Sequence, residues 1–152
     1  LYMQNIKKIQ IVKVNFGKNV QIIEPVNLYE CEIGDNCFIG PFVEIQSEAS
    51  LGNYNRIQSH TFICSRVKIG NNCFVGHGVV FINDKFEKGG PSGKEKFKQT
   101  LIGDNVSIGS NSTILPVNIC NKVVIGAGSV VTKNISKSGI YAGNPAKFLR
   151  EI

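Results

Sequence analysis

Two histidines of this sequence, His60 and His77, carry side chains that are suited to proton transfer. An imidazole ionises near neutral pH, so it can take a proton from an attacking nucleophile. Each residue can equally be a turn histidine whose ring is hydrogen-bonded to its surroundings. The residues alone leave both interpretations open.

Asn83 and Asp84 stand where a regular apolar pattern stops and a Lys- and Gly-rich segment, residues 84–100, begins. Asn and Asp at such a point commonly form turns. The segment itself is either a solvated surface loop or a loop that is extruded over a site. Because it interrupts an otherwise regular repeat, we favour the second interpretation.

The regular pattern places a large apolar residue at every sixth position: Ile33, Ile39, Ile45, Leu51, Ile57, Ile63, Ile69, Val75 and Phe81. A helix requires a period of 3.6 residues and a half-buried strand requires strict alternation. A period of six that is maintained over this length indicates a repeat architecture. The sequence therefore predicts an all-β parallel β-helix, in which three hexapeptides form one triangular coil and residues 18 apart stack ~4.8 Å from one another.

The repeat divides the chain into segments of a single domain, residues 1–152. Residues 1–13 are expected to be an irregular lead that covers the open end of the coils. Residues 14–83 form the first coils, 84–100 the extruded loop and 101–136 the last coils. Residues 137–152 are predicted to form a turn and a short helix, because Asn144 suits an N-cap and Pro145 a first helical position.

Stacking predicts three columns of side chains, two of them at corners of the coils. One corner column holds Pro41, Ser59, His77, Ser110 and Ala127, and the next holds Ser47, Ser65, Asn83, Pro116 and Lys133. In the third column, Arg66 lies between Glu48 and Asp84. A cation in that position would lower the pKa of Asp84 and make it a clamp for an ammonium group more than a strong base.

Composition narrows the possible functions. The net charge of +6 indicates either a mildly basic surface without a specific role or a surface that attracts small anions. No basic run alternates with aromatic residues, as it does in many nucleic-acid-binding proteins. No apolar run is long enough for a membrane span. The five cysteines form no CxxC pair, so they are expected to be small buried hydrophobes in a reducing, cytoplasmic setting, with no metal site.

The segments IGAGSVVTKNI (125–135) and YAGNPAKFLR (141–150) resemble the ending of the left-handed β-helix, or hexapeptide-repeat, acyltransferases. Within that superfamily, EPVNLYECEIGDNCFIGPFVEIQ (24–46), IQSHTFIC (57–64) and FVGHGVVFIND (74–84) resemble the N-acetyltransferases of nucleotide-linked amino sugars. The resemblance implies the left-handed coil, acetyl-CoA as co-substrate without a metal, and a homotrimer with active sites between subunits.

The resemblance also implies roles for individual residues. Catalysis would fall to Asn83, Asp84, His77 and His60, with Asn83 orienting the amine and Asp84 accepting a hydrogen bond. The substrate would contact Glu44, Ser65 and Arg66. Coenzyme A would contact Ser110, Ala127, Gly128, Lys133, Asn144, Pro145, Lys147 and Arg150. Related sequences often carry Glu where this chain has Ser65, which removes one candidate base.

The expected function is therefore acetyl transfer from acetyl-CoA to the amine of a UDP- or dTDP-linked amino-deoxy sugar, for surface polysaccharide or glycan biosynthesis. An O-acetyltransferase of the same fold is the alternative, and it would need a firmer base because a hydroxyl is the weaker nucleophile. A non-catalytic β-helix that serves as a binding subunit is a third possibility.

Overall fold

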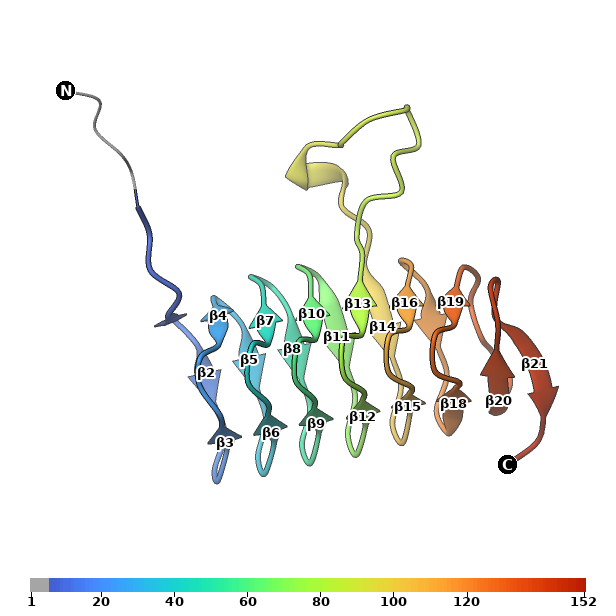
Figure 1. Ribbon diagram of the computed structural model, residues 1–152, viewed down its shortest axis with the longest axis horizontal. Coiled ribbons are helices and arrows are strands. Elements are labelled where there is room, and N and C mark those ends of the chain that lie inside the picture. The colour runs from blue at the N-terminus through green and yellow to red at the C-terminus, as the bar shows by residue number, and fades with distance from the viewer. Residues whose placement is uncertain (1–5) are drawn as a thin grey trace.

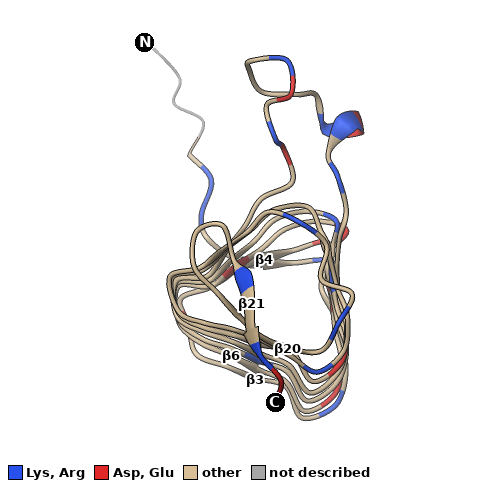
Figure 2. Ribbon diagram, turned by 90° about the vertical axis from the view of Figure 1, so that its right-hand side faces the viewer, with Lys and Arg blue, Asp and Glu red and all other residues tan. Residues whose placement is uncertain are grey.

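The computed structural model describes residues 6–152 as a stack of triangular coils, with three parallel sheets as the faces (Figures 1 and 2). Each coil contributes one short strand to each sheet, and the next coil pairs with it in parallel. The predicted left-handed parallel β-helix is confirmed.

Sheet A has seven strands in chain order: β1 (Ile11–Val12), β4 (Asn27–Tyr29), β7 (Glu44–Ile45), β10 (Phe62–Ile63), β13 (Val80–Phe81), β16 (Thr113–Ile114) and β19 (Val130–Val131). Sheet B has six: β2 (Asn15–Phe16), β5 (Glu32–Ile33), β8 (Ser50–Leu51), β11 (Val67–Ile69), β14 (Thr100–Ile102) and β17 (Asn118–Ile119). Sheet C has eight: β3 (Gln21–Ile22), β6 (Phe38–Ile39), β9 (Arg56–Ile57), β12 (Phe74–Val75), β15 (Ser107–Ile108), β18 (Val123–Ile125), β20 (Gly139–Ala142) and β21 (Lys147–Arg150).

The register follows the predicted repeat of 18 residues. Ile45 pairs with Ile63 in sheet A, and Ile57 pairs with Val75 in sheet C. The large residues of the hexapeptides point inward and are buried, as Ile45 and Phe81 illustrate with 0% exposure. A single apolar core therefore runs along the axis of the stack and holds the corners in fixed columns.

Polar side chains reinforce one edge of the core. The buried Asn55 donates from its amide nitrogen to the carbonyls of Gly52 (3.0 Å) and Gly70 (2.8 Å), and its amide oxygen accepts the Cys73 N–H at 2.8 Å. Outside it, the side-chain oxygen of Asn53 accepts the Asp35 N–H, also at 2.8 Å. These bonds join successive coils at the corner between sheets B and C.

The loop of residues 84–100 leaves the stack after β13 and returns at β14, as predicted (Figure 1). It contains a 3₁₀-helix, η1 (Lys94–Lys96). Because Phe62 pairs with Val80 and Val80 with Thr113, the loop is an insertion between two coils that remain in register.

The two ends of the chain differ from the prediction. Residues 1–5 of the expected irregular lead lie outside the described residues. Residues 11–12 form β1, which pairs with β4, and the Leu28 N–H donates to the Gln10 carbonyl at 3.1 Å, while residues 6–9 lead away from the stack (Figures 1 and 2).

The prediction of a short C-terminal helix was wrong, because this segment forms two strands, β20 and β21. β20 pairs in parallel with β18, and β21 folds back antiparallel on β20. The rings of Tyr141 and Phe148 meet edge to face at 5.4 Å across this hairpin. The local helix signals of Asn144 and Pro145 are overridden because the last coil has an open edge, and a strand satisfies its backbone groups.

Candidate active site

The structure assembles the first predicted column, which we call the His77 corner: Pro41, Ser59, His77, Ser110 and Ala127. Its backbones are linked coil to coil, since the Gly78 N–H donates to the Ser59 carbonyl and the Gly128 N–H to the Ser110 carbonyl. This corner leads from sheet C into sheet A.

His77 is held from both neighbouring coils. Its Nδ1 lies 2.8 Å from the Ser59 hydroxyl oxygen, and its backbone N–H donates to the Ser110 hydroxyl at 3.2 Å. A hydroxyl can donate or accept, so the bond from Ser59 fits either neutral tautomer of the imidazole. Within residues 6–152, no hydrogen bond engages Nε2, and the side chain is exposed. The arrangement orients an accessible imidazole nitrogen.

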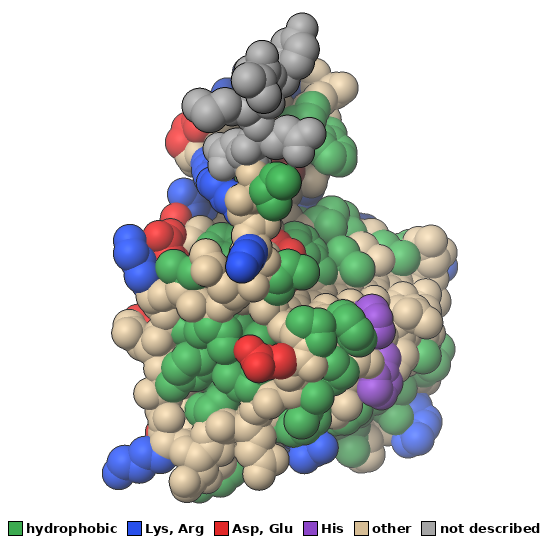
Figure 3. Space-filling model, turned by 60° about the vertical axis from the view of Figure 1, so that its left-hand side comes forward, with side chains coloured by type: hydrophobic (Ala, Val, Ile, Leu, Met, Phe, Trp, Pro, Cys, Tyr) green, Lys and Arg blue, Asp and Glu red, His purple; other side chains and the backbone are tan. Residues whose placement is uncertain are grey.

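His60 lies beside this corner in a different setting. Its ring stacks on the exposed ring of Phe42 at a centroid distance of 4.8 Å, and its backbone has a left-handed φ of 62°. Figure 3 shows the two histidines next to one another at the margin of a face that is rich in hydrophobic side chains. The sequence analysis did not single out Phe42 as a partner of His60, although their spacing of 18 residues gave the signal.

Five of the eight predicted contacts of coenzyme A, namely Ser110, Ala127, Gly128, Asn144 and Pro145, lie at or above the same corner. Gly109 allows the coils to stack here, because a Cβ on it would clash with the Ala127 backbone, whereas a Cβ on Gly128, whose φ is 68°, would meet no atom within 4 Å. The turn that contains Asn144 and Pro145 packs above them, since the Val130 N–H donates to the Gly143 carbonyl at 2.9 Å. Small residues thus leave the edge open to a long, thin ligand.

The predicted basic residues lie further apart. Lys133 sits in the other corner column, while Lys147 and Arg150 are exposed on β21. The Arg150 guanidinium donates to the Glu151 carbonyl at 3.0 Å. These three residues therefore do not form one cluster.

The second column, which we call the Asn83 corner, holds Ser47, Ser65, Asn83, Pro116 and Lys133. The Asn83 amide nitrogen donates to the Ser65 hydroxyl at 2.9 Å and to the Ser65 carbonyl at 3.3 Å. A carbonyl oxygen only accepts, so the nitrogen must face Ser65 and the amide oxygen must face away. Among the described residues no donor engages that oxygen. Asn83 thus presents an acceptor.

Asp84 is held by the extruded loop. Its carboxylate accepts the backbone N–H of Phe86 at 2.9 Å and that of Ser92 at 2.5 Å. These bonds, that from Ser92 first, lower the pKa of Asp84. The direction of the predicted shift is confirmed, but its cause is not the expected one.

Arg66 makes other contacts than predicted. Its Nε lies 3.1 Å from the Glu48 carboxylate, and its Nη1 donates to the Phe97 carbonyl at 2.8 Å. Among residues 6–152 Glu48 is its sole carboxylate partner within 4.0 Å, so the predicted Arg66–Asp84 pair was wrong. The reason is that the loop draws Asp84 toward its own backbone.

Glu44 lies between the two corners, on the outer side of β7, where its carboxylate accepts a 2.9 Å hydrogen bond from the Gln46 amide. β13 separates His77 from Asn83 within one coil. Six residue steps of ~3.3 Å place them up to ~20 Å apart. The two candidate catalytic side chains therefore lie at opposite ends of β13, at different corners of the coil.

The cysteines are free thiols, as predicted. Burial raises the pKa of Cys64 to about 12 and that of Cys31 to about 11. Neither is activated as a thiolate nucleophile, because a thiol with so high a pKa stays protonated near neutral pH.

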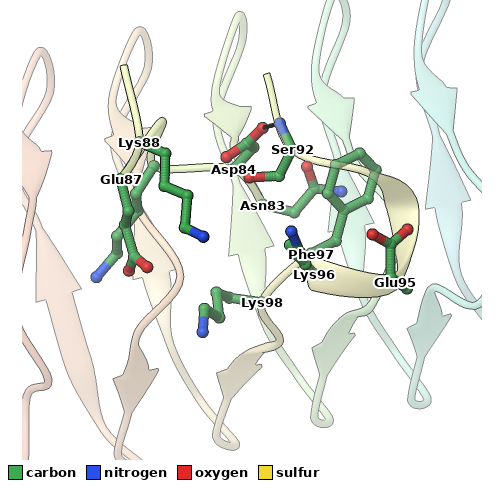
Figure 4. Close-up of a pocket in the computed structure, with 10 residues that line it drawn as sticks. Asn83, Asp84, Glu87, Lys88, Ser92, Glu95, Lys96, Phe97 and Lys98 are labelled. Atoms are coloured by element: carbon green, nitrogen blue, oxygen red, sulfur yellow. Dashed lines mark hydrogen bonds between the residues drawn. The ribbon is translucent and has the colours of Figure 1, made fainter. Parts of the chain in front are cut away.

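The sequence analysis missed the lysines of the extruded loop. Four of them line a pocket beside Asn83, whose full lining is Asn83, Asp84, Lys85, Glu87, Lys88, Ser92, Glu95, Lys96, Phe97 and Lys98 (Figure 4). The density of lysines in residues 84–100 was the available signal, but the pattern gave no indication of which side chains would face Asn83.

Family models describe most of the regular coils. A hexapeptide repeat of succinyl-transferase matches residues 66–82 and 99–133, and a bacterial transferase hexapeptide of six repeats matches residues 30–65. Together they match more than half of the chain. This chain belongs to the hexapeptide-repeat transferases. The observation that decides it is the match of both models to the stacked coils that build the two corners.

Curated relatives include the bifunctional protein GlmU of Streptococcus uberis, which is 31% identical over 93% of this chain. GlmU of Clostridium beijerinckii is also 31% identical, over 86% of the chain. The chain spans about a third of the length of these curated relatives, 32% and 30%.

Solved structures share the fold. A point variant of AntD, an N-acyltransferase from Bacillus cereus in complex with dTDP and coenzyme A, superposes with a TM-score of 0.80 at 24% identity, over 93% of this chain and 85% of that one. PerB from Caulobacter crescentus, in complex with CoA and GDP-perosamine, gives a TM-score of 0.63 at 16% identity, over 91% of this chain and 57% of that one.

The described residues contain no helix that is long and apolar enough to cross a membrane.

Proposed function

We propose that this hexapeptide-repeat transferase is an acyltransferase that moves the acetyl group of acetyl-CoA to the amine of a UDP- or dTDP-linked amino-deoxy sugar, for surface polysaccharide or glycan biosynthesis. The observation that carries the proposal is the fixed amide of Asn83. Its free oxygen accepts an N–H from the substrate amine and holds that nitrogen in place.

The chemistry requires little beyond positioning. A neutral primary amine is a good nucleophile, so the enzyme must place it against the thioester carbonyl and remove one proton as the C–N bond forms. The oriented imidazole of His77 accepts that proton, and the departing thiolate is a second acceptor. The edge formed by Ser110, Ala127 and Gly128 would hold the pantetheine arm, with Asn144 and Pro145 beside the adenine.

Two solved structures with this fold support CoA as the carrier of the acyl group and a nucleotide-linked sugar as its acceptor. AntD was solved with dTDP and coenzyme A, and PerB with CoA and GDP-perosamine. Both have the same coil stack as this chain.

The separation of the two corners implies an assembly. We propose a homotrimer in which the Asn83 corner of one copy faces the His77 corner of the next, so that amine and thioester meet between subunits. The outer side of sheet A between these corners carries Phe62, Val80 and Ile82, all half-buried, which a neighbouring copy would cover.

The test is a panel of UDP- and dTDP-linked amino sugars incubated with acetyl-CoA, with release of free thiol as the readout. Thiol release that depends on the amine, with an amide in the product, is the expected result. An ester product, or no release with any member although CoA raises the thermal stability of the protein, would contradict the proposal.

A further inference from the structure

The extruded loop encloses a pocket that lies outside the coils and beside Asn83. It has a volume of about 380 Å³, and its lining includes Asn83, Phe97, four lysines and the carboxylates of Asp84, Glu87 and Glu95. Such a volume is in the range of pockets that take small ligands.

Bonds to the coils fix the shape of this pocket. Asp84 accepts the Phe86 and Ser92 N–H groups, and Arg66 donates to the Phe97 carbonyl. The Lys98 N–H donates to the Asn83 carbonyl at 2.9 Å, which ties the returning arm of the loop to the residue from which the loop departs. The pocket is therefore formed by an anchored loop.

Four lysines and three carboxylates, those of Asp84, Glu87 and Glu95, line the pocket, and no lining lysine forms an ion pair with a carboxylate within 4.0 Å among residues 6–152. The three ion pairs within residues 6–152 are Lys13–Glu30, Arg66–Glu48 and Lys137–Glu151, and none involves Lys88, Lys96 or Lys98. Figure 4 shows these three lysines around the open space between the two arms of the loop. The Asp84 carboxylate already accepts two backbone hydrogen bonds. The lining thus carries a net charge of +1, and its unpaired lysine ammonium groups are available to an anionic ligand.

We infer that this pocket binds the diphosphate of the nucleotide-linked substrate, through Lys88, Lys96 and Lys98. The inference rests on the proposed function and adds the subsite that recognises the substrate. In a nucleotide sugar the diphosphate is attached directly to the ring, so an anchored diphosphate places the ring next to Asn83.

Coenzyme A also contains a diphosphate, and the two sources must be distinguished. Within one chain β13 separates the pocket from the proposed coenzyme edge at the His77 corner, but in the proposed trimer the His77 corner of the next copy faces the Asn83 corner. In CoA the whole pantetheine arm separates the diphosphate from the thioester, whereas in the sugar nucleotide the diphosphate is attached to the ring that carries the amine. A pocket beside Asn83 therefore favours the diphosphate of the sugar nucleotide.

The test measures binding without turnover. The dissociation constants of dTDP, UDP and CoA are determined by calorimetry for the wild type and for a triple variant, Lys88→Gln, Lys96→Gln and Lys98→Gln. The matched control is Lys94→Gln, because Lys94 belongs to the same loop but does not line the pocket.

We expect the triple variant to bind dTDP or UDP at least ~10-fold more weakly, with CoA binding unchanged and Lys94→Gln equal to the wild type. The KM for the amino sugar should rise in parallel. Unchanged nucleotide affinity in a folded triple variant, or a loss of CoA affinity instead, would overturn the inference.

Failure of the proposed function gives a different pattern. A protein that binds nucleoside diphosphates through these lysines but transfers no acyl group supports the pocket and refutes the activity. Transfer to the amine with an unchanged KM in the triple variant supports the activity and refutes the pocket.

Discussion

The amide nitrogen of Asn83 lies 2.9 Å from the hydroxyl oxygen of Ser65, one coil below it in the same column. This bond, with that to the Ser65 carbonyl, determines which end of the amide faces the loop pocket. The proposed roles of both residues follow from it: Asn83 contacts the substrate, and Ser65 positions Asn83.

Asn83→Ala removes the acceptor for the substrate amine. We expect turnover to fall ~100-fold or more, as when one preorganised hydrogen-bonding group is lost from an active site, while the dissociation constant of CoA changes little. Steady-state kinetics and calorimetry measure the two quantities. A larger effect on CoA than on turnover would move Asn83 into the coenzyme site.

Ser65→Ala leaves Asn83 with only the longer bond to the Ser65 carbonyl. The amide loses part of its orientation, so turnover should fall ~3- to 10-fold, the effect of one neutral hydrogen bond. Ser47→Ala is the matched control, because Ser47 occupies the same column one coil further from Asn83. Equal turnover in the two variants would refute the positioning role of Ser65.

His77→Ala tests whether the imidazole is the necessary base. For an amine substrate we expect a loss of ~10- to 100-fold, because general-base catalysis disappears while positioning remains. Ser59→Ala should weaken the same step less, since the imidazole keeps its place but loses an orienting bond. Complete loss of activity in His77→Ala, with a hydroxyl as the accepting group, would support the O-acetyltransferase alternative.

Asp84 should control the order of the loop in a pH-dependent way. Its pKa is lowered in the folded protein, so its contribution to loop stability is complete above the ordinary Asp value of ~3.9 and is lost as the pH falls through the lowered value. Hydrogen exchange at the Phe86 and Ser92 amides should therefore stay slow at pH 5. Asp84→Asn should speed it at that pH; unchanged exchange would refute the anchor.

Asn55→Ala tests the polar support of the core. It would leave the Cys73 N–H and the Gly52 and Gly70 carbonyls without their side-chain partner. We expect the free energy of unfolding to fall by ~2–4 kcal/mol, measured by urea denaturation. Asn53→Ala, which removes one bond on the exposed side of the same edge, should lose only ~1 kcal/mol; a comparable loss would contradict the account.

The sequence was sufficient to predict the coils because burial alone specifies them. Ile45, Ile63 and Phe81 recur at a spacing that only stacked coils bury together, so the columns through Ser59 and His77 and through Ser65 and Asn83 followed from counting. The contacts of residues outside the core were harder to predict. Nothing in the repeat indicates that Asp84 turns to the Ser92 N–H, because that contact depends on the conformation of the inserted loop.

The wrong prediction of a short C-terminal helix has a similar origin. Asn144 and Pro145 carry local signals that fit the start of a helix, and a pattern analysis weighs only such signals. The deciding factor was the unpaired edge of β18, which β20 completes through the pairing of Ile125 with Tyr141. That edge is visible only after the coils have been stacked.

The most direct test of the account is to mix two impaired proteins, His77→Ala and Asn83→Ala, after they have been dissociated and reassembled together. If each site joins the Asn83 corner of one copy to the His77 corner of the next, about a quarter of the sites in a one-to-one mixture combine both intact residues. We predict that acetyl transfer recovers to about that fraction of the wild-type rate. A mixture that forms mixed oligomers and is no more active than the average of its two components would contradict the account.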